Sequence, residues 1–190
     1  MKKPVVIAEI GCNHKGEMEI AKELIKVAKI FGNADIVKFQ KRNNKELLTE
    51  EQYNAPHPNP ANAYGETYGE HREFLEFNKE QHAELKAYCE ELDIEYSTSV
   101  WDLTSAKEIS ALNPKLIKIP SACNNNFTML EWLCDNFSGE IHVSTGMTTK
   151  DEIEKVVQLF EKKGRNKDVV LYNCTSGYPV PFEDVCLLEI

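Results

Sequence analysis

Asp35-Ile36-Val37-Lys38-Phe39-Gln40 is the stretch of sequence that decides the fold. The run is mostly apolar, as a buried strand is, but it carries a lysine and ends on a glutamine. Side chains of a strand alternate between its two faces, so Lys38 and Gln40 share one face. Val37 and Phe39 share the other. A buried strand with polar groups at its carboxyl end is typical of a parallel sheet that carries a ligand site at that edge.

Five further apolar runs also end in polar residues: 5–9, 94–98, 116–119, 141–144 and 168–173. Between the runs, apolar residues recur at helical spacing within 21–28, 85–92, 130–137 and 153–160, and a weaker helix is predicted over 104–112. Thr149 with Glu152, and Asn78 with Gln81, form capping-box patterns, and Gly164 stands where a helix should end. This alternation predicts βαβ units and a parallel sheet.

The number of predicted strands that end in polar residues distinguishes a barrel from a doubly wound sheet. The polar ends come from six different runs, which fits a barrel, because a doubly wound sheet concentrates its site at one switch point. The sequence contains neither GxGxxG after its first strand nor a Walker A motif. We therefore predict an α/β fold, a (β/α)8 barrel of the TIM type that is incomplete, with about six β/α units in one domain over residues 1–190. The polar segment 41–77 is predicted to be a long functional or disordered loop over the catalytic face.

Composition restricts the class of protein. The formal charge is −9 without a basic stripe, which argues against nucleic acid as a partner. No stretch approaches the roughly 20 apolar residues of a membrane span, and the short run 5–10 does not fit a signal peptide. The six cysteines contain no CxxC pair, so we expect reduced thiols in or near the core, no zinc site and a cytoplasmic protein.

Two lysines at strand ends, Lys38 and Lys118, are the main electrostatic signal. Lysines and neighbouring hydroxyl groups that converge at a barrel mouth suit a phosphate or carboxylate ligand. The competing interpretation is that Lys38 is paired with Glu9 or Asp35 in a structural ion pair. The residues alone leave both interpretations open.

Glu9, at the end of the first predicted strand, is a candidate catalytic residue. A carboxylate there acts as a base, binds a sugar hydroxyl, or forms a structural ion pair, and its sequence context does not separate these roles. His14 lies in the following glycine-flanked loop and is expected on the polar surface. His142 shares a strand face with Ser144 and is expected to be a hydrogen-bonded core histidine.

Residues 7–16, Ile-Ala-Glu-Ile-Gly-Cys-Asn-His-Lys-Gly, resemble the opening motif of sialic acid synthases. Further segments of this chain resemble the family in the same order: Val37–Gln40, Thr67–Arg72, Ser97–Ser99, Lys118–Ser121, Asn124–Phe127, Ser144–Met147, Cys174–Pro179 and Glu183–Val185. The resemblance covers essentially the whole chain and identifies it as a member of that family.

The resemblance implies condensation of phosphoenolpyruvate with an N-acetylmannosamine-like amino sugar, with release of phosphate. It implies that Glu9 lies at the reacting centre and Tyr178 near the sugar. The residues that it places around phosphoenolpyruvate are Lys38, Gln40, Thr98, Lys118, Ser121 and Ser144. It also implies a homo-oligomer that handles only small-molecule substrates, and a divalent metal, manganese or magnesium, whose ligands lie beyond this chain.

Two departures from the family pattern are visible. Pro120 and Ala122 stand where many relatives have glycines, which alters the approach of backbone to ligand. The final barrel strands and the antifreeze-like domain of the family are expected to be absent from 1–190. The alternative function is therefore a catalytically incompetent fragment or phosphate-binding module of the same fold. A phosphoenolpyruvate-using barrel of the aromatic pathway fits the tyrosine-containing motifs less well.

Overall fold

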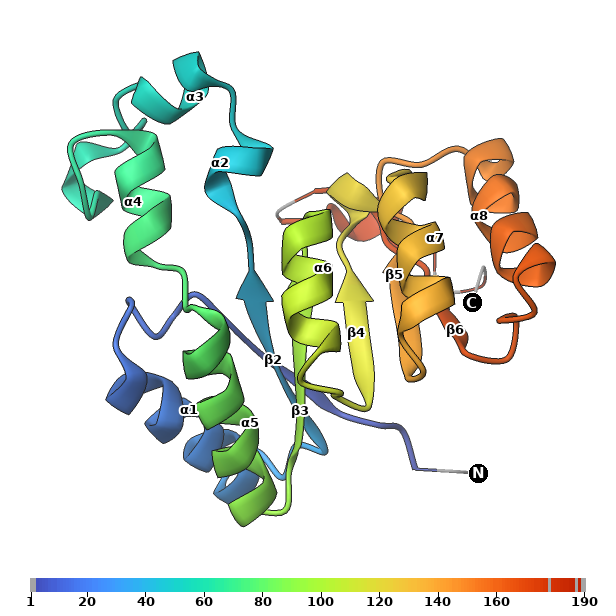
Figure 1. Cartoon of the computed structure of the whole chain (residues 1–190), viewed down its shortest axis with the longest axis horizontal. Helices are drawn as coiled ribbons and strands as arrows, with labels where there is room; N and C mark the ends of the chain where they lie inside the picture. The colour runs from blue at the N-terminus through green and yellow to red at the C-terminus, as the bar shows by residue number, and fades with distance from the viewer. Residues whose placement is uncertain (1–2, 178, 187, 189–190) are drawn as a thin grey trace.

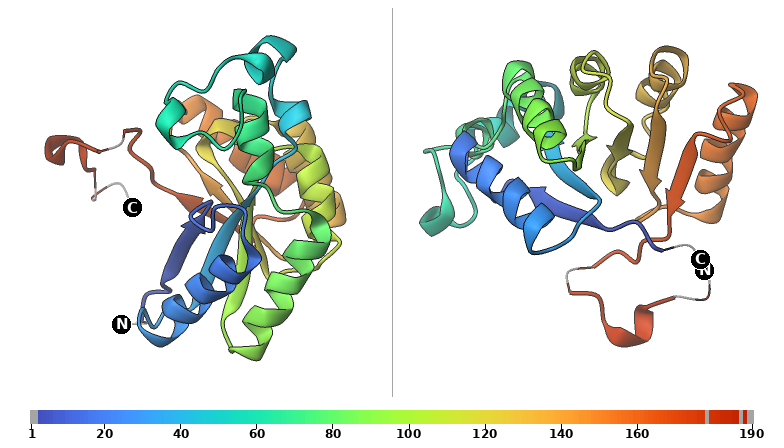
Figure 2. Two further views of the ribbon diagram at one scale, coloured as in Figure 1. Left: turned by 90° about the vertical axis from the view of Figure 1, so that its left-hand side faces the viewer. Right: turned by 90° about the horizontal axis from the view of Figure 1, so that it is seen from below.

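The computed structural model describes residues 3–177, 179–186 and 188. Its strands form one parallel sheet in sequence order: β1 (Ile7–Gly11), β2 (Ile36–Lys41), β3 (Glu95–Val100), β4 (Leu116–Ile119), β5 (Glu140–Ser144) and β6 (Val169–Tyr172). The sheet curls, and the helices lie along its convex side (Figures 1 and 2). The prediction of an incomplete barrel is confirmed.

The long helices lie between successive strands: α1 (Met18–Ile30), α5 (Lys79–Glu91), α6 (Leu103–Ser110), α7 (Phe127–Asn136) and α8 (Lys150–Lys162). Both predicted capping boxes are formed, at Asn78 and at Thr149, and Gly164 adopts the positive φ of 68° that ends a helix. Short 3₁₀ turns follow β4 and β6, η2 (Ser121–Cys123) and η3 (Phe182–Asp184).

The segment predicted as a long irregular loop is largely helical, so that prediction is wrong in its structure. It holds α2 (Asn44–Leu47), α3 (Glu50–Asn54), the 3₁₀ turn η1 (Pro60–Asn62) and α4 (Tyr68–Phe74). Thr49 and Thr67 each form a capping box, and these boxes start α3 and α4. We call residues 42–76 the insertion. It extends past the carboxyl end of β2 (Figure 1).

Two of the differences between predicted and observed strand boundaries bear on the core and the site. The first strand was predicted over 5–9 and begins at Ile7, because Val5 and Val6 lie outside the ladder and are 66% and 43% exposed. The third strand continues to Val100 rather than ending at residue 98. This second difference changes the assignment of one site residue, described below.

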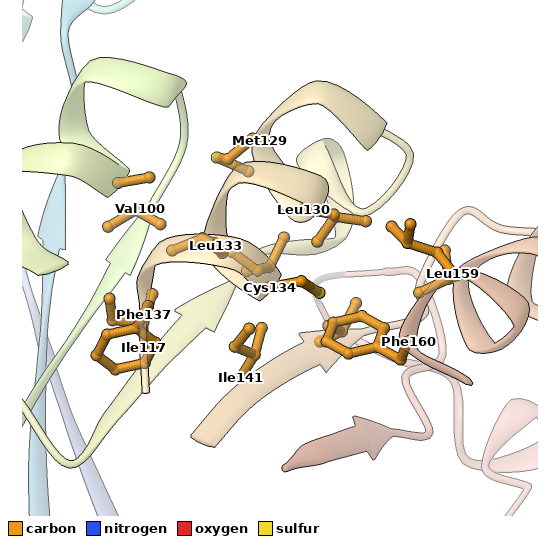
Figure 3. Close-up of a cluster of buried hydrophobic side chains, with 14 of the residues drawn as sticks. Val100, Ile117, Met129, Leu130, Leu133, Cys134, Phe137, Ile141, Leu159 and Phe160 are labelled. Carbon is orange, nitrogen blue, oxygen red and sulfur yellow. The ribbon is translucent and has the colours of Figure 1, made fainter. Parts of the chain in front are cut away.

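The helix-facing side chains of the sheet make the core. Under α6, α7 and α8 a buried cluster joins Ile117, Ile141 and Val143 to helix residues such as Leu133 and Phe160 (Figure 3). A second cluster lies under α1 and α5: Ile10, Ala21, Ile25, Val37, Phe39, Leu85 and Tyr96 belong to it. The opposite face of the strands is therefore left to the polar side chains.

The last strand, β6, exposes apolar side chains. Val170 and Leu171 of β6 are each 40% exposed, and β6 pairs only with β5 among the described residues.

None of the helices in this described part of the chain is long and apolar enough to cross a membrane.

Leu133 is fully buried in the centre of α7, so Leu133→Ala should lower the free energy of unfolding. Removal of a buried leucine side chain leaves a cavity and costs about 2–5 kcal/mol. Urea denaturation followed by circular dichroism measures the loss. The control is Glu131→Ala on the exposed face of the same helix, which should change the stability by less than about 0.5 kcal/mol. Equal effects of the two substitutions would contradict the core described here.

Candidate active site

A cavity of about 540 Å³ lies at the carboxyl end of the sheet. It is lined by residues from the ends of β1 to β5 and from the chain after β6. The polar and aromatic residues that line it are Glu9, Lys38, Gln40, Ser99, Trp101, Lys118, Ser121, Ser144, Cys174, Thr175 and Ser176. None of the described residues of the insertion belongs to its wall.

Strand register explains why these side chains meet. Glu9 is opposite Lys38 in the β1–β2 pair, and Gln40 is opposite Ser99 in the β2–β3 pair. Ser99 is in turn opposite Lys118 in the β3–β4 pair. Because parallel strands alternate in phase, polar residues of neighbouring strands form one continuous row on the inner face.

Glu9 is held from two sides by β2. The ammonium group of Lys38 donates to Oε2 of Glu9, and the amide of Gln40 donates to Oε1 over 3.3 Å. Lys38 also donates to Oγ of Ser99 over 3.3 Å. Lys38 therefore forms the ion pair that the sequence offered as an alternative, and its partner is Glu9. Asp35 instead accepts from the backbone N–H of Val6.

Lys118 forms the second cationic point of the cavity. Its ammonium group donates to Oγ of Ser144 over 2.6 Å and to the carbonyl of Ile119 over 3.1 Å. The thiol of Cys174 lies 3.3 Å from the same Ser144 oxygen. Lys118 is only 9% exposed, and this burial, reinforced by the nearby charge of Lys38, lowers the pKa of Lys118 to about 8. The site thus contains a lysine whose charge lacks a carboxylate partner within salt-bridge distance in the described chain.

The loop after β5 closes one side of the cavity. The backbone N–H of Gly146 donates to Oγ of Ser121 over 3.1 Å, and that of Met147 donates to Oγ of Ser176 over 2.7 Å. A Cβ atom at Gly146 would lie 2.8 Å from Oγ of Ser121, so a larger residue there would push the Ser121 hydroxyl away from this contact. Buried Asn124 donates to the carbonyl of Ser144 over 3.0 Å and fixes the start of the loop.

Most of the residues expected around phosphoenolpyruvate line the cavity, but Thr98 does not. Thr98 is fully buried and lies on the helix-facing side of β3, between Tyr96 and Val100. The inner position belongs to Ser99. Strand alternation contained the signal, because the apolar neighbours Tyr96 and Val100 put Thr98 on the core face.

The structure also differs from the sequence prediction in the burial of one histidine and in further residues that line the cavity. His14 is 2% exposed and stacks on Phe77 at 4.1 Å between ring centroids, so its prediction as a surface residue is wrong. Its burial lowers its pKa to about 4. Trp101, Cys174 and Ser176 line the cavity without having been predicted. Tyr178 lies outside the described residues.

His142 matches its prediction as a hydrogen-bonded core histidine. It is 7% exposed, and its Nδ1 lies 2.8 Å from the hydroxyl of Tyr172. Its Nε2 lies 3.1 Å from a carboxylate oxygen of Glu140.

Comparison with known proteins places these features in a family. The sequence pattern of the NeuB family matches residues 24–190. N-acetylneuraminate-9-phosphate synthase of Drosophila melanogaster is 40% identical over 97% of this chain, and N,N'-diacetyllegionaminic acid synthase of Campylobacter jejuni is 34% identical over 98%. The chain belongs to the NeuB family.

A solved structure of similar fold agrees with that assignment. The crystal structure of N-acetylneuraminic acid (sialic acid) synthetase from Leptospira borgpetersenii superposes with a TM-score of 0.78 at 27% identity, covering 96% of this chain. The chain spans about half the length of the curated relatives, covering 48% of the Drosophila protein and 58% of the Leptospira chain.

The metal that the NeuB resemblance implies finds no ligand set among the described residues. No group of three or more histidine, cysteine, aspartate or glutamate side chains is close enough there to hold a cation. At the cavity the carboxylate of Glu9 is already engaged by Lys38 and Gln40. The residues present in 3–177 and 179–186 therefore do not by themselves fit a metal centre.

The charge state of Lys118 should control anion binding at this NeuB cavity. Above a pKa of about 8 the side chain is neutral and no longer attracts an anion, so the affinity of the cavity for an anion such as sulfate should fall as pH rises from 7.5 to 9.5. The fall should approach about tenfold per pH unit. Isothermal titration calorimetry measures it. Lys118→Met should bind weakly with no such pH dependence, and an unchanged slope in that variant would show that another group titrates.

Proposed function

We propose that this chain provides the phosphoenolpyruvate site of a synthase that condenses phosphoenolpyruvate with an N-acetylmannosamine-like amino sugar. The observation that carries the proposal is the convergence of Lys38, Lys118 and the hydroxyls of Ser99, Ser121 and Ser144 on one recessed cavity. The names of the relatives, which are sialic acid and legionaminic acid synthases, support the same class of reaction.

Electrostatics favours a ligand with two anionic groups. Among the described residues Lys118 has hydroxyl, carbonyl and aromatic partners but no carboxylate, so an arriving phosphate or carboxylate supplies the countercharge that this buried cation lacks. Lys38 already has a carboxylate partner in Glu9. A second anionic group of the ligand would therefore share the Lys38 ammonium group with Glu9. The chain as a whole carries a charge of −9, which makes this local cationic pair necessary for anion binding.

Hydroxyl and backbone groups complete the anion site. Ser121 and Ser144 accept hydrogen bonds from Gly146 and Lys118, and each hydroxyl proton remains available for a ligand oxygen. Ser99 does the same beside Lys38. Fixed donors of this kind orient a planar enol phosphate so that one face of its double bond is open.

The proposed reaction balances without a redox partner. A carbon–carbon bond forms between C3 of phosphoenolpyruvate and the aldehyde carbon of the open-chain sugar, whose oxygen gains a proton. Water adds to C2, and the C2–O bond to the phosphoryl group breaks, which releases phosphate and leaves a 2-keto acid. We assign the proton transfer in these steps to Glu9, and its contacts with Lys38 and Gln40 at the cavity support this role.

A divalent cation, manganese or magnesium, is proposed for the family reaction, where it would polarise the aldehyde as a Lewis acid. The described residues of this chain account for anion binding and for the placement of Glu9. Assembly into a homo-oligomer is proposed on the same family basis, and a cytoplasmic location on the cysteine pattern of the sequence.

Phosphoenolpyruvate should bind to the wild-type chain, and Lys118→Met should weaken binding at pH 7 by about tenfold to a hundredfold. That is the range for loss of one charge-assisted hydrogen bond, about 1.5–3 kcal/mol. Lys107→Met on the exposed face of α6 is the matched control and should bind normally. Calorimetry measures both.

Release of phosphate is then followed with phosphoenolpyruvate, manganese or magnesium, and N-acetylmannosamine or its 6-phosphate. Release that needs both substrates supports the synthase proposal. Binding without release supports the alternative of a phosphate-binding module. Absence of phosphoenolpyruvate binding contradicts both.

A further inference from the structure

Trp101 occupies a position at the cavity that the proposed reaction has not used. It directly follows β3, and its ring forms part of the cavity wall. Its indole N–H donates to Oε1 of Gln40 over 2.7 Å. The contact is among the shorter ones around the cavity and joins the ends of two neighbouring strands.

The direction of this hydrogen bond determines how the Gln40 amide is turned. An indole N–H only donates, so Gln40 must present its oxygen to Trp101. Its NH₂ group then points the other way, and it donates to Oε1 of Glu9 over 3.3 Å. Rotation of the amide by 180° would put two donors face to face and an oxygen against the Glu9 carboxylate. The Gln40 amide therefore has only one favourable orientation between Trp101 and Glu9.

Trp101 is itself held firmly. The guanidinium of Arg42 lies over its ring, 4.6 Å from the centroid. Arg42 is fixed in turn by Glu76 through a 2.9 Å ion pair, and both of these side chains are 9% exposed. On the backbone side, the carbonyl of Trp101 lies 3.1 Å from Sγ of Cys123. The indole is therefore a fixed donor rather than a mobile surface group.

We propose that Trp101 is a positioning residue, which acts through the Gln40 amide to hold the Glu9 carboxylate in place at the cavity. The proposal rests on the proposed function in one respect, the role of Glu9 in the reaction. The contacts that define it belong to the fold of the chain and are measurable without turnover.

The hydrogen bond is tested first, by nuclear magnetic resonance. The chain has two tryptophans, Trp101 and Trp132, so Trp132→Phe assigns the two indole N–H signals. Gln40→Ala should shift the Trp101 indole signal and accelerate its exchange with water by about tenfold, the factor that an ordinary hydrogen bond is worth. Trp101→Phe should release the Gln40 amide, which lowers its ¹⁵N order parameter. Unchanged indole exchange in Gln40→Ala would overturn the proposal.

The effect on Glu9 is tested by a double-mutant cycle on phosphate release. Trp101→Phe keeps an aromatic ring beneath Arg42 and removes the N–H group together with the five-membered ring that carries it. It should lower kcat by about tenfold to a hundredfold, since misplacement of a reacting group by about 1 Å costs on that order. The KM for phosphoenolpyruvate should stay within about twofold, because the cationic anchor Lys118 is untouched. In the Gln40→Ala background the same substitution should have no further effect.

The outcomes separate this inference from the proposed function. Independent, multiplicative losses in the double variant would show that Trp101 does not act through Gln40, and would overturn the inference. Trp132→Phe, on α7 and away from the cavity wall, should leave kcat unchanged. If the wild-type chain releases no phosphate, the turnover part of the proposed function fails for this chain. The indole and amide signals then decide the inference alone.

Discussion

The alternation of side chains along parallel strands is the constraint on which this structure depends. Val37 and Phe39 of β2 face the helices and are fully buried, while Lys38 and Gln40 face inward. The same strand thus contributes to the core and to the site. A shift of its register by one residue would turn the apolar side chains towards the cavity and the polar side chains towards the core. Repeated over neighbouring strands in register, this alternation produces a row of polar groups that no single segment could build.

Much of the fold was predictable because its signals are local. The helix starts at Asn78 and Thr149, the order of the strands and the inward position of Lys38 all follow from spacing in the sequence. The insertion was missed because its helices are short, and their stability comes from capping and mutual packing rather than from long apolar periodicity. His14 was misplaced because its burial depends on Phe77, which is far along the chain.

The candidate site was predictable to the extent that its residues end strands. Thr98 was the exception, because the third strand was predicted to end two residues too early. With its end at Val100, strand alternation assigns Ser99 to the cavity. Trp101 could not have been found in this way. Its importance comes from one hydrogen bond to Gln40 and one contact with Arg42, and both partners lie about 60 residues earlier in the chain. Contacts of this kind are created by the fold and leave no periodic trace.

The hydrogen bonds of Glu76 determine which segment of this fold tolerates a change of length. The carboxylate of Glu76 accepts from both the guanidinium and the backbone N–H of Arg42, so one residue joins the two ends of the insertion. Because the ends are fixed side by side, doubling the length of the intervening chain would add only about 0.6 kcal/mol of closure entropy. The chain between Arg42 and Glu76 can therefore be exchanged or lengthened at a small entropic cost, as long as Arg42 and Glu76 themselves are kept. A designer could graft a different segment between residues 42 and 76 on the same principle.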